Sequence, residues 1–221
     1  LSRAVLAREL DATKRDIVAS RVDLTYACAK EAEPLLSELA RSHDEAGAKA
    51  AWLLVQTGTR KPSSFDASLS DPLEGFRAVA ARGLDDESDG NQRRTALIDP
   101  SPLVRRAAVQ ALARFDSDRT RAAMRLALGD ESSGVRIAAA AVLGRASSSE
   151  ALADLERLAR DGDGRVAAAA VRAAGELLDG WGDRKPVDGD WLRGTVEREP
   201  FVALAAVETL ARVGGPIAAE A

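Results

Sequence analysis

The sequence contains almost none of the residues on which catalytic and metal sites usually depend. In 221 residues there is one histidine, His43, and one cysteine, Cys28. A Ser-His-Asp or Cys-His arrangement would have to use His43, and no Walker A, H-E-x-x-H or paired-cysteine motif is present. A single cysteine also excludes an internal disulfide framework. The sequence therefore predicts no enzyme, no catalytic residue, no metal site and no cofactor.

Aromatic residues and long apolar runs are also scarce. Only 4% of the residues are aromatic, although 46% are hydrophobic. Such a chain can fill thin layers between stacked helices with Leu, Val and Ala, where each layer contacts only its neighbours. No run of about 18 apolar residues exists, so no transmembrane helix is predicted. We expect a cytoplasmic protein; because the chain starts at Leu1 without a methionine, a fragment or a processed exported protein is the alternative.

One sequence pattern recurs along most of the chain. "DESSGVRIAAAAVLGRA" (130–146) follows "DPSPLVRRAAVQALARF" by 31 residues and precedes "DGDGRVAAAAVRAAGEL" by another 31. We call Val135, and the residue at the equivalent position of each other copy, the slot residues. The slot residues are Ala48, Phe76, Val104, Val135, Val166 and Val202, with spacings of 28, 28, 31, 31 and 36. A period in this range is typical of a solenoid.

Shorter amphipathic segments lie between these alanine-rich stretches. Residues 118–130 and 149–161 carry apolar residues at helical spacing. Turn residues, such as Asp-Pro at 99–100 and Gly-Asp-Gly at 162–164, precede the alanine-rich stretches. Each unit is therefore predicted to be two antiparallel helices joined by a short turn, and small side chains let the second helices approach closely.

The predicted fold is a right-handed all-α solenoid of about six to seven antiparallel helical hairpins. We expect residues 31–221 to form a single continuous domain. Residues 1–30 are predicted to be N-terminal capping helices, because terminal repeats are usually atypical.

An aspartate stands six positions before an arginine in three copies. This pattern, with alanines soon after the arginine, resembles HEAT repeats, in particular the short lyase-like HEAT repeats of phycobilisome lyases, over about residues 31–214. The resemblance implies that the Asp lies in the turn, that the Arg lies in the second helix, and that together they form a hydrogen-bonded ladder along the stack. The expected ladder residues are Asp71, Arg77, Asp99, Arg105, Asp130 and Arg136.

The outer copies depart from this pattern. The first has His43 and Lys49 at the two positions, and the fifth has Asp161 but Ala167. The ladder is therefore expected only in the three central copies, and His43 is interpreted as a polar turn residue.

Charge is distributed unevenly along the chain. The net charge is −4, but residues 91–145 carry a net +5 between two acidic flanks, 31–90 at −6 and 146–221 at −5. The sequence pI is near 5.3, and no aromatic residue lies between Phe76 and Phe115, which argues against nucleic-acid binding. The positive belt suits a protein partner with an acidic or amphipathic segment.

Two surfaces are candidates for binding that partner. Second helices of such solenoids line the concave face, where extended partners usually lie. The residues expected to line it are Arg82, Arg106, Gln110, Ile137, Ala141 and Arg172. Trp181 and Trp191 occupy the lengthened connection 179–191 and form the second candidate; alternatively, they cover the end of the hydrophobic layer.

These features predict a non-enzymatic protein–protein interaction scaffold, with its partner on the concave face, as part of a larger protein or complex. The resemblance implies one alternative, a phycobilin lyase or chromophore chaperone. A HEAT-like nucleic-acid-binding protein is the less favoured alternative.

Overall fold

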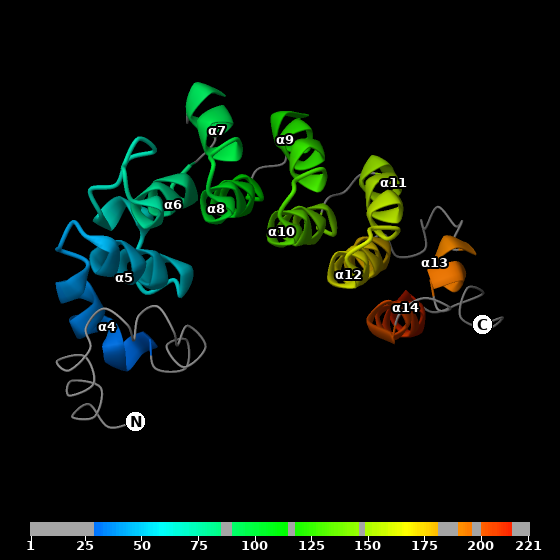
Figure 1. Ribbon diagram of the computed structural model, residues 1–221. Coiled ribbons are helices and arrows are strands. Elements are labelled where there is room, and N and C mark those ends of the chain that lie inside the picture. Colours follow the sequence, from blue (N-terminus) through cyan, green and yellow to red (C-terminus); the bar gives the residue numbers. More distant parts are fainter. Residues whose placement is uncertain are drawn as a thin grey trace. The chain divides into compact units, whose positions relative to one another are not determined.

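The computed structural model describes residues 29–84, 90–114, 118–145, 149–180, 190–195 and 200–213. Throughout these residues the secondary structure is helical and no strand is present (Figure 1). The prediction of an all-α repeat fold is thus confirmed, whereas its handedness and the number of hairpins stay predictions. Most of the predicted cap, residues 1–28, lies outside the described part of the chain.

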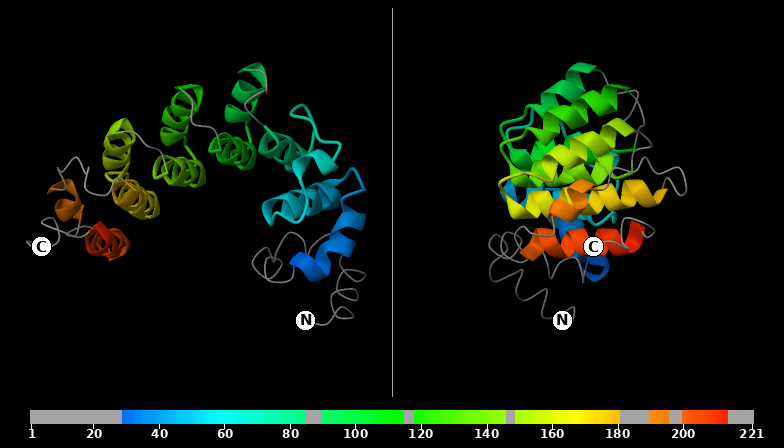
Figure 2. Two further views of the ribbon diagram at one scale, coloured as in Figure 1. Left: turned by 180° about the vertical axis from the view of Figure 1, so that it is seen from behind. Right: turned by 90° about the vertical axis from the view of Figure 1, so that its right-hand side faces the viewer.

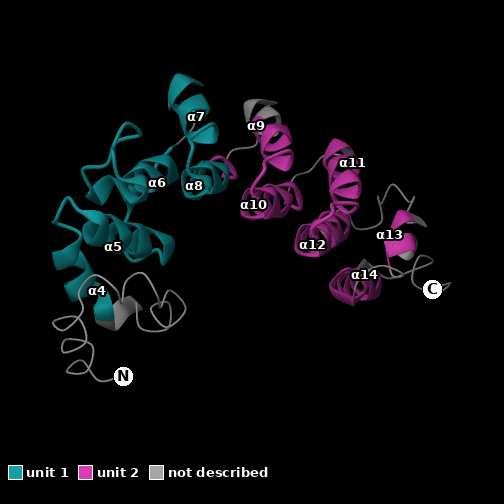
Figure 3. Cartoon of the chain, viewed as in Figure 1, with its two compact units in different colours: residues 1–111 teal, residues 112–221 magenta. Residues whose placement is uncertain are grey.

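The chain divides into two compact units, residues 1–111 and 112–221 (Figure 3). A single continuous domain over residues 31–221 stays a prediction. The first unit contains α4 (Ala29–Leu39), α5 (Glu45–Gln56), the 3-10 helix η1 (Pro62–Ser64), α6 (Glu74–Arg82), α7 (Gly90–Leu97) and α8 (Pro102–Leu112, ending at the boundary). The second contains α9 (Asp118–Leu128), α10 (Ser133–Leu143), α11 (Ser149–Leu158), α12 (Gly164–Gly180), α13 (Asp190–Thr195) and α14 (Pro200–Val213).

Helices in the second unit form hairpins whose second members pack side by side. Helix α10 follows α9, α12 follows α11 and α14 follows α13, and α12 contacts both α10 and α14. Two views of the ribbon show α10, α12 and α14 in one row with α9 and α11 in another (Figure 2). None of the described helices is long and apolar enough to cross a membrane.

Small residues make the contact between neighbouring second helices close. The slot residues Val104, Val135, Val166 and Val202 are at most 1% exposed. Ala138, Ala139, Val142 and Leu143 of α10 are buried as well. A Cβ atom on Gly144 would lie 2.8 Å from the carbonyl oxygen of Ala173 on α12. The alanine block of α10 therefore serves a helix–helix contact that a larger side chain would obstruct.

One copy lacks its first helix. Between α5 and α6, residues 57–73 contain only the single turn η1, so the prediction of two helices in every unit is wrong here. Pro62 and Pro72 interrupt helical hydrogen bonding, Gly58 adopts a positive φ of 72°, and serines replace the apolar periodicity. Helix α5 instead packs directly against α6.

Candidate partner-binding site

The turn before each central second helix is closed by its aspartate. One carboxylate oxygen of Asp99 accepts a hydrogen bond of 2.8 Å from the backbone N–H of Ser101. Asp71, Asp130 and Asp161 make the same bond, also at 2.8 Å, to the residue two positions on. This Asx turn fixes the chain direction into the following helix.

In each unit one arginine joins a turn to the following turn. Arg77 donates from Nε to Oδ2 of Asp99 at 2.8 Å and from Nη2 to Oδ1 at 3.2 Å. Arg136 donates to Asp161 in the same way, from Nε to Oδ2 at 2.8 Å and from Nη2 to Oδ1 at 3.1 Å. A two-point arginine–carboxylate contact fixes orientation as well as distance. The carboxylate partner of Arg77 and of Arg136 is thus the aspartate of the following turn, not the one six residues before it.

The aspartate six residues before each arginine also contributes, through its backbone. Nη1 of Arg77 donates to the carbonyl of Asp71 at 2.9 Å, and Nη1 of Arg105 donates to the carbonyl of Asp99 at 2.8 Å. Arg136 does the same toward Asp130 at 2.7 Å. The hydrogen bond with Asp99 raises the pKa of Arg77 above its already high value, so the arginine of this rung stays protonated.

His43 supplies the first rung. Its Nε2 lies 3.0 Å from Oδ2 of Asp71, and its ring stacks on Phe76 at a centroid distance of 4.6 Å. Lys49, which holds the arginine position in this copy, lies 3.8 Å from Glu45 on its own helix. His43 is therefore a turn residue that also takes the place of an arginine.

Replacing His43 by alanine is expected to lower the free energy of unfolding by about 1 kcal/mol, because the Asp71 carboxylate loses a partner. That carboxylate is only 7% exposed. Lys49→Ala is the matched control, with an expected change within about 0.5 kcal/mol because its ion pair is exposed. Urea unfolding measures the change in the free energy of unfolding for both variants. A larger loss for Lys49→Ala would contradict this account. It would mean that Lys49, which holds the arginine position of this copy, stabilises the turn more than the contact between His43 and Asp71 does.

The rung pattern changes again in the fifth copy. Arg165 binds Asp163 in its own turn at 3.0 Å instead of reaching forward. Hydrogen bonding to Arg165 lowers the pKa of Asp163 to about 2. The carboxylates of Asp71 and Asp161 thus both take part in the ladder. Asp161 is bound by Arg136 of the preceding second helix, so it needs no arginine six positions after it.

Polar side chains lie on the second helices of the first unit, away from the ladder. Arg106 and Gln110 stand one turn apart on α8, so both lie on one helix face. Both side chains are half-buried, and within the described residues Arg106 Nε and Gln110 Oε1 are buried atoms with no hydrogen-bond partner. Half-buried Arg82 on α6 precedes Gln110 by 28 residues, one repeat. We call Arg82, Arg106 and Gln110 the polar row.

The predicted residues of the second unit are placed differently. Ile137 is half-buried and Ala141 exposed on α10, four residues apart on one face. Arg172, exposed on α12 one repeat after Ala141, lies 3.3 Å from Glu208 on α14. Trp191 is half-buried in α13, whereas Trp181 lies outside the described residues. The described residues include only one of the two tryptophans, so a surface formed by both stays a prediction.

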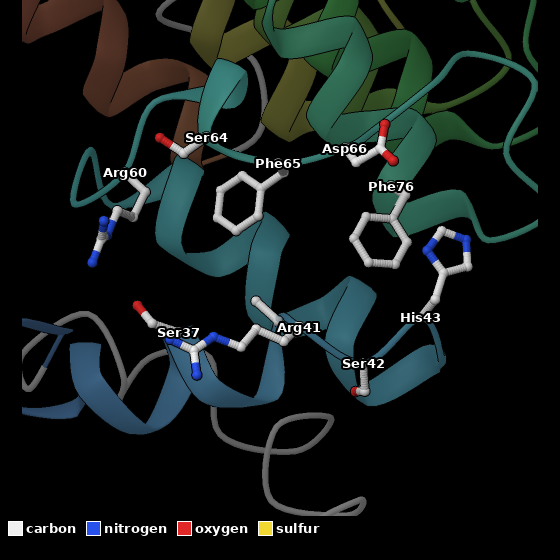
Figure 4. Close-up of a pocket in the computed structure, with 10 residues that line it drawn as sticks. Ser37, Arg41, Ser42, His43, Arg60, Ser64, Phe65, Asp66 and Phe76 are labelled. Carbon is white, nitrogen blue, oxygen red and sulfur yellow. The ribbon is translucent and has the colours of Figure 1, made fainter.

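A hollow that sequence reasoning missed lies beside the first rung (Figure 4). Its volume is about 470 Å³, and the segment that lacks a first helix forms one wall. Phe65 points into it, His43 and Phe76 stack at one side, and Arg41 and Ser37 line another (Figure 4). The Ser- and Pro-rich composition of residues 57–73 was the only sequence signal for it. In the described part of the chain, no three His, Cys, Asp or Glu side chains gather to hold a metal ion.

Comparison with known proteins agrees with this architecture. Residues 90–175 match the family model for HEAT repeats. No curated protein matches the chain. The matched segment runs from α7 into α12 and includes the rung between Arg136 and Asp161. Residues 90–175 are therefore identified as HEAT repeats.

Proposed function

We propose that the protein is a non-enzymatic scaffold that binds a protein segment along the second-helix face, with the polar row at the centre of the site in the first unit. HEAT repeats generally mediate protein–protein interaction, which supports the general role. Ile137, Ala141 and Arg172 are the corresponding contact residues proposed in the second unit, and Trp181 and Trp191 remain the second proposed surface.

One observation carries the proposal. Arg106 Nε and Gln110 Oε1 are buried polar atoms without a hydrogen-bond partner among the described residues. A buried polar atom without a partner is costly, so a ligand that draws these side chains outward and supplies the partner gains binding energy. The guanidinium of Arg106 favours a carboxylate as that partner. Asp or Glu side chains of an amphipathic segment provide such groups beside apolar ones.

The test uses peptides selected on the full chain from a random display library. We expect the selected peptides to be rich in Asp, Glu and apolar residues. Arg106→Glu should slow association of these peptides by about tenfold and reduce its dependence on salt, because the positive charge speeds encounter. Arg82→Glu combined with Arg106→Glu should slow it further.

Arg94→Glu is the matched control, since Arg94 is exposed on α7, a first helix. It makes the same change of charge outside the polar row and should leave the association rate within about twofold. Gln110→Glu adds a variant that introduces a negative charge without removing an arginine. If Arg94→Glu and Arg106→Glu slow association equally, the polar row is not the site, and the tryptophan surface becomes the better candidate.

A further inference from the structure

A stripe of exposed apolar side chains runs along α14. Phe201, Leu204 and Val207 are 67%, 54% and 52% exposed, and Ala211 is exposed one turn later. These residues recur at three- and four-residue steps, so they share one face of the helix. On its other side α14 contacts α12, and it also contacts α13 (Figure 1). We call Leu204, Val207 and Ala211 the α14 stripe.

The same positions are covered in the preceding second helix. Ala168, Val171 and Gly175, 36 residues before the α14 stripe, are buried. The hydroxyl of Thr209 on α14 donates to the carbonyl of Val171 at 3.2 Å. A Cβ atom on Gly175 would lie 2.8 Å from the Thr209 side chain. Helix α14 therefore lies on the face of α12 that corresponds to the α14 stripe.

Helix α10 uses the equivalent face in the same way. Gly144, one repeat before Gly175, lies directly against Ala173 of α12. Two successive second helices of this unit thus receive another helix on this face. On α14 that face holds larger apolar side chains and is exposed.

Charge indicates which kind of helix would bind there. Arg172 lies beside the covered face of α12 and donates to Glu208 of α14 at 3.3 Å. Glu208 holds the equivalent position beside the α14 stripe, with the opposite charge. A helix bound there in the same manner would therefore place a basic residue against Glu208. A second copy of α14, paired antiparallel about Val207, would instead bring two Glu208 carboxylates together, which is unfavourable.

We propose that the α14 stripe is a docking surface for an amphipathic helix of a partner protein, with small apolar side chains along its contact face and a lysine or arginine opposite Glu208. The small side chains are required because Leu204 and Ala211 are larger than Ala168 and Gly175, their counterparts on α12. This surface is separate from the polar row.

The probe is a lactam-bridged helical peptide with the sequence of residues 200–213, the helix that covers α12, carrying Glu208→Lys. It should bind the full chain, and Leu204→Lys in the chain should weaken binding at least about tenfold by removing apolar contact. The peptide that retains Glu208 should bind roughly fivefold more weakly. The Glu208→Lys variant of the chain should reverse that preference between the two peptides.

Fluorescence anisotropy measures these affinities, and circular dichroism verifies that each variant is folded. The proposal is overturned if the lysine-bearing peptide does not bind at millimolar concentration, or if Leu204→Lys binds it as well as the wild type does. Sedimentation velocity adds the competing occupant. A dimer of the chain that Leu204→Lys dissociates would assign the α14 stripe to a second copy instead.

Discussion

Asp99→Ala is expected to lower the free energy of unfolding by about 3–5 kcal/mol. The Asp99 carboxylate is 5% exposed and binds both the Arg77 guanidinium and the N–H of Ser101. Its removal leaves the positive charge of Arg77, whose side chain is only 15% exposed, without this partner. Urea unfolding followed by circular dichroism measures the loss.

Glu156→Ala is the control for that substitution. Glu156 lies 2.8 Å from Arg160, the same distance as Arg77 from Asp99, but the side chains of this pair are 35% and 69% exposed. Solvent screening limits such a pair to about 0.5 kcal/mol. Equal losses in the two variants would mean that burial gives the ladder no special role in stability.

The second large effect is expected at Gly144. Gly144→Ala should lower the free energy of unfolding by roughly 1–3 kcal/mol, because its new Cβ atom would meet the backbone of Ala173. The distances to the carbonyl oxygen and Cα of Ala173 would be 2.8 and 2.9 Å. The backbone of α12 cannot rotate away as a flexible side chain could, so the two helices must separate. Thermal unfolding of the variant measures the loss.

Gly134→Ala, in the first turn of α10, should have the opposite sign. A Cβ atom there would meet only Ser132 Oγ, at 3.7 Å, an ordinary contact. Alanine should then stabilise the protein by about 0.5–1 kcal/mol through its lower backbone entropy in the unfolded chain. A stabilising effect at both glycines would contradict the close approach between α10 and α12.

Much of the fold could be predicted from the sequence because positions that recur in every repeat indicate which residues are buried. The slot residues Val104, Val135 and Val166 recur at fixed spacing, and a position that must be buried in every copy restricts its residue type. The same reasoning found the alanine-rich contact of α10. It failed between α5 and α6, where η1 replaces a helix, because a regular period implies a complete unit unless the local Pro and Gly residues are weighed against it.

The functional surfaces were less accessible to sequence reasoning. The six-residue offset between Asp71 and Arg77 indicated a ladder, but the carboxylate partner of Arg77 is Asp99, 22 residues on, and only the stacking of units brings them together. The contact between His43 and Asp71 could not be predicted either, because His43 is not an arginine and stands at the aspartate position of its copy. The α14 stripe was missed because Leu204 and Val207 have the helical spacing expected of buried residues, and spacing does not show whether a neighbouring helix is present.

The central claim is that a partner segment binds on the second-helix face of the first unit. Photo-crosslinking tests it most directly, with a diazirine group placed in a display-selected acidic peptide and the sites on the full chain located by mass spectrometry. The proposed site predicts crosslinks to α6 and α8, around Arg82 and Gln110. Crosslinks confined to α7, or to the segment around Trp191, would contradict it.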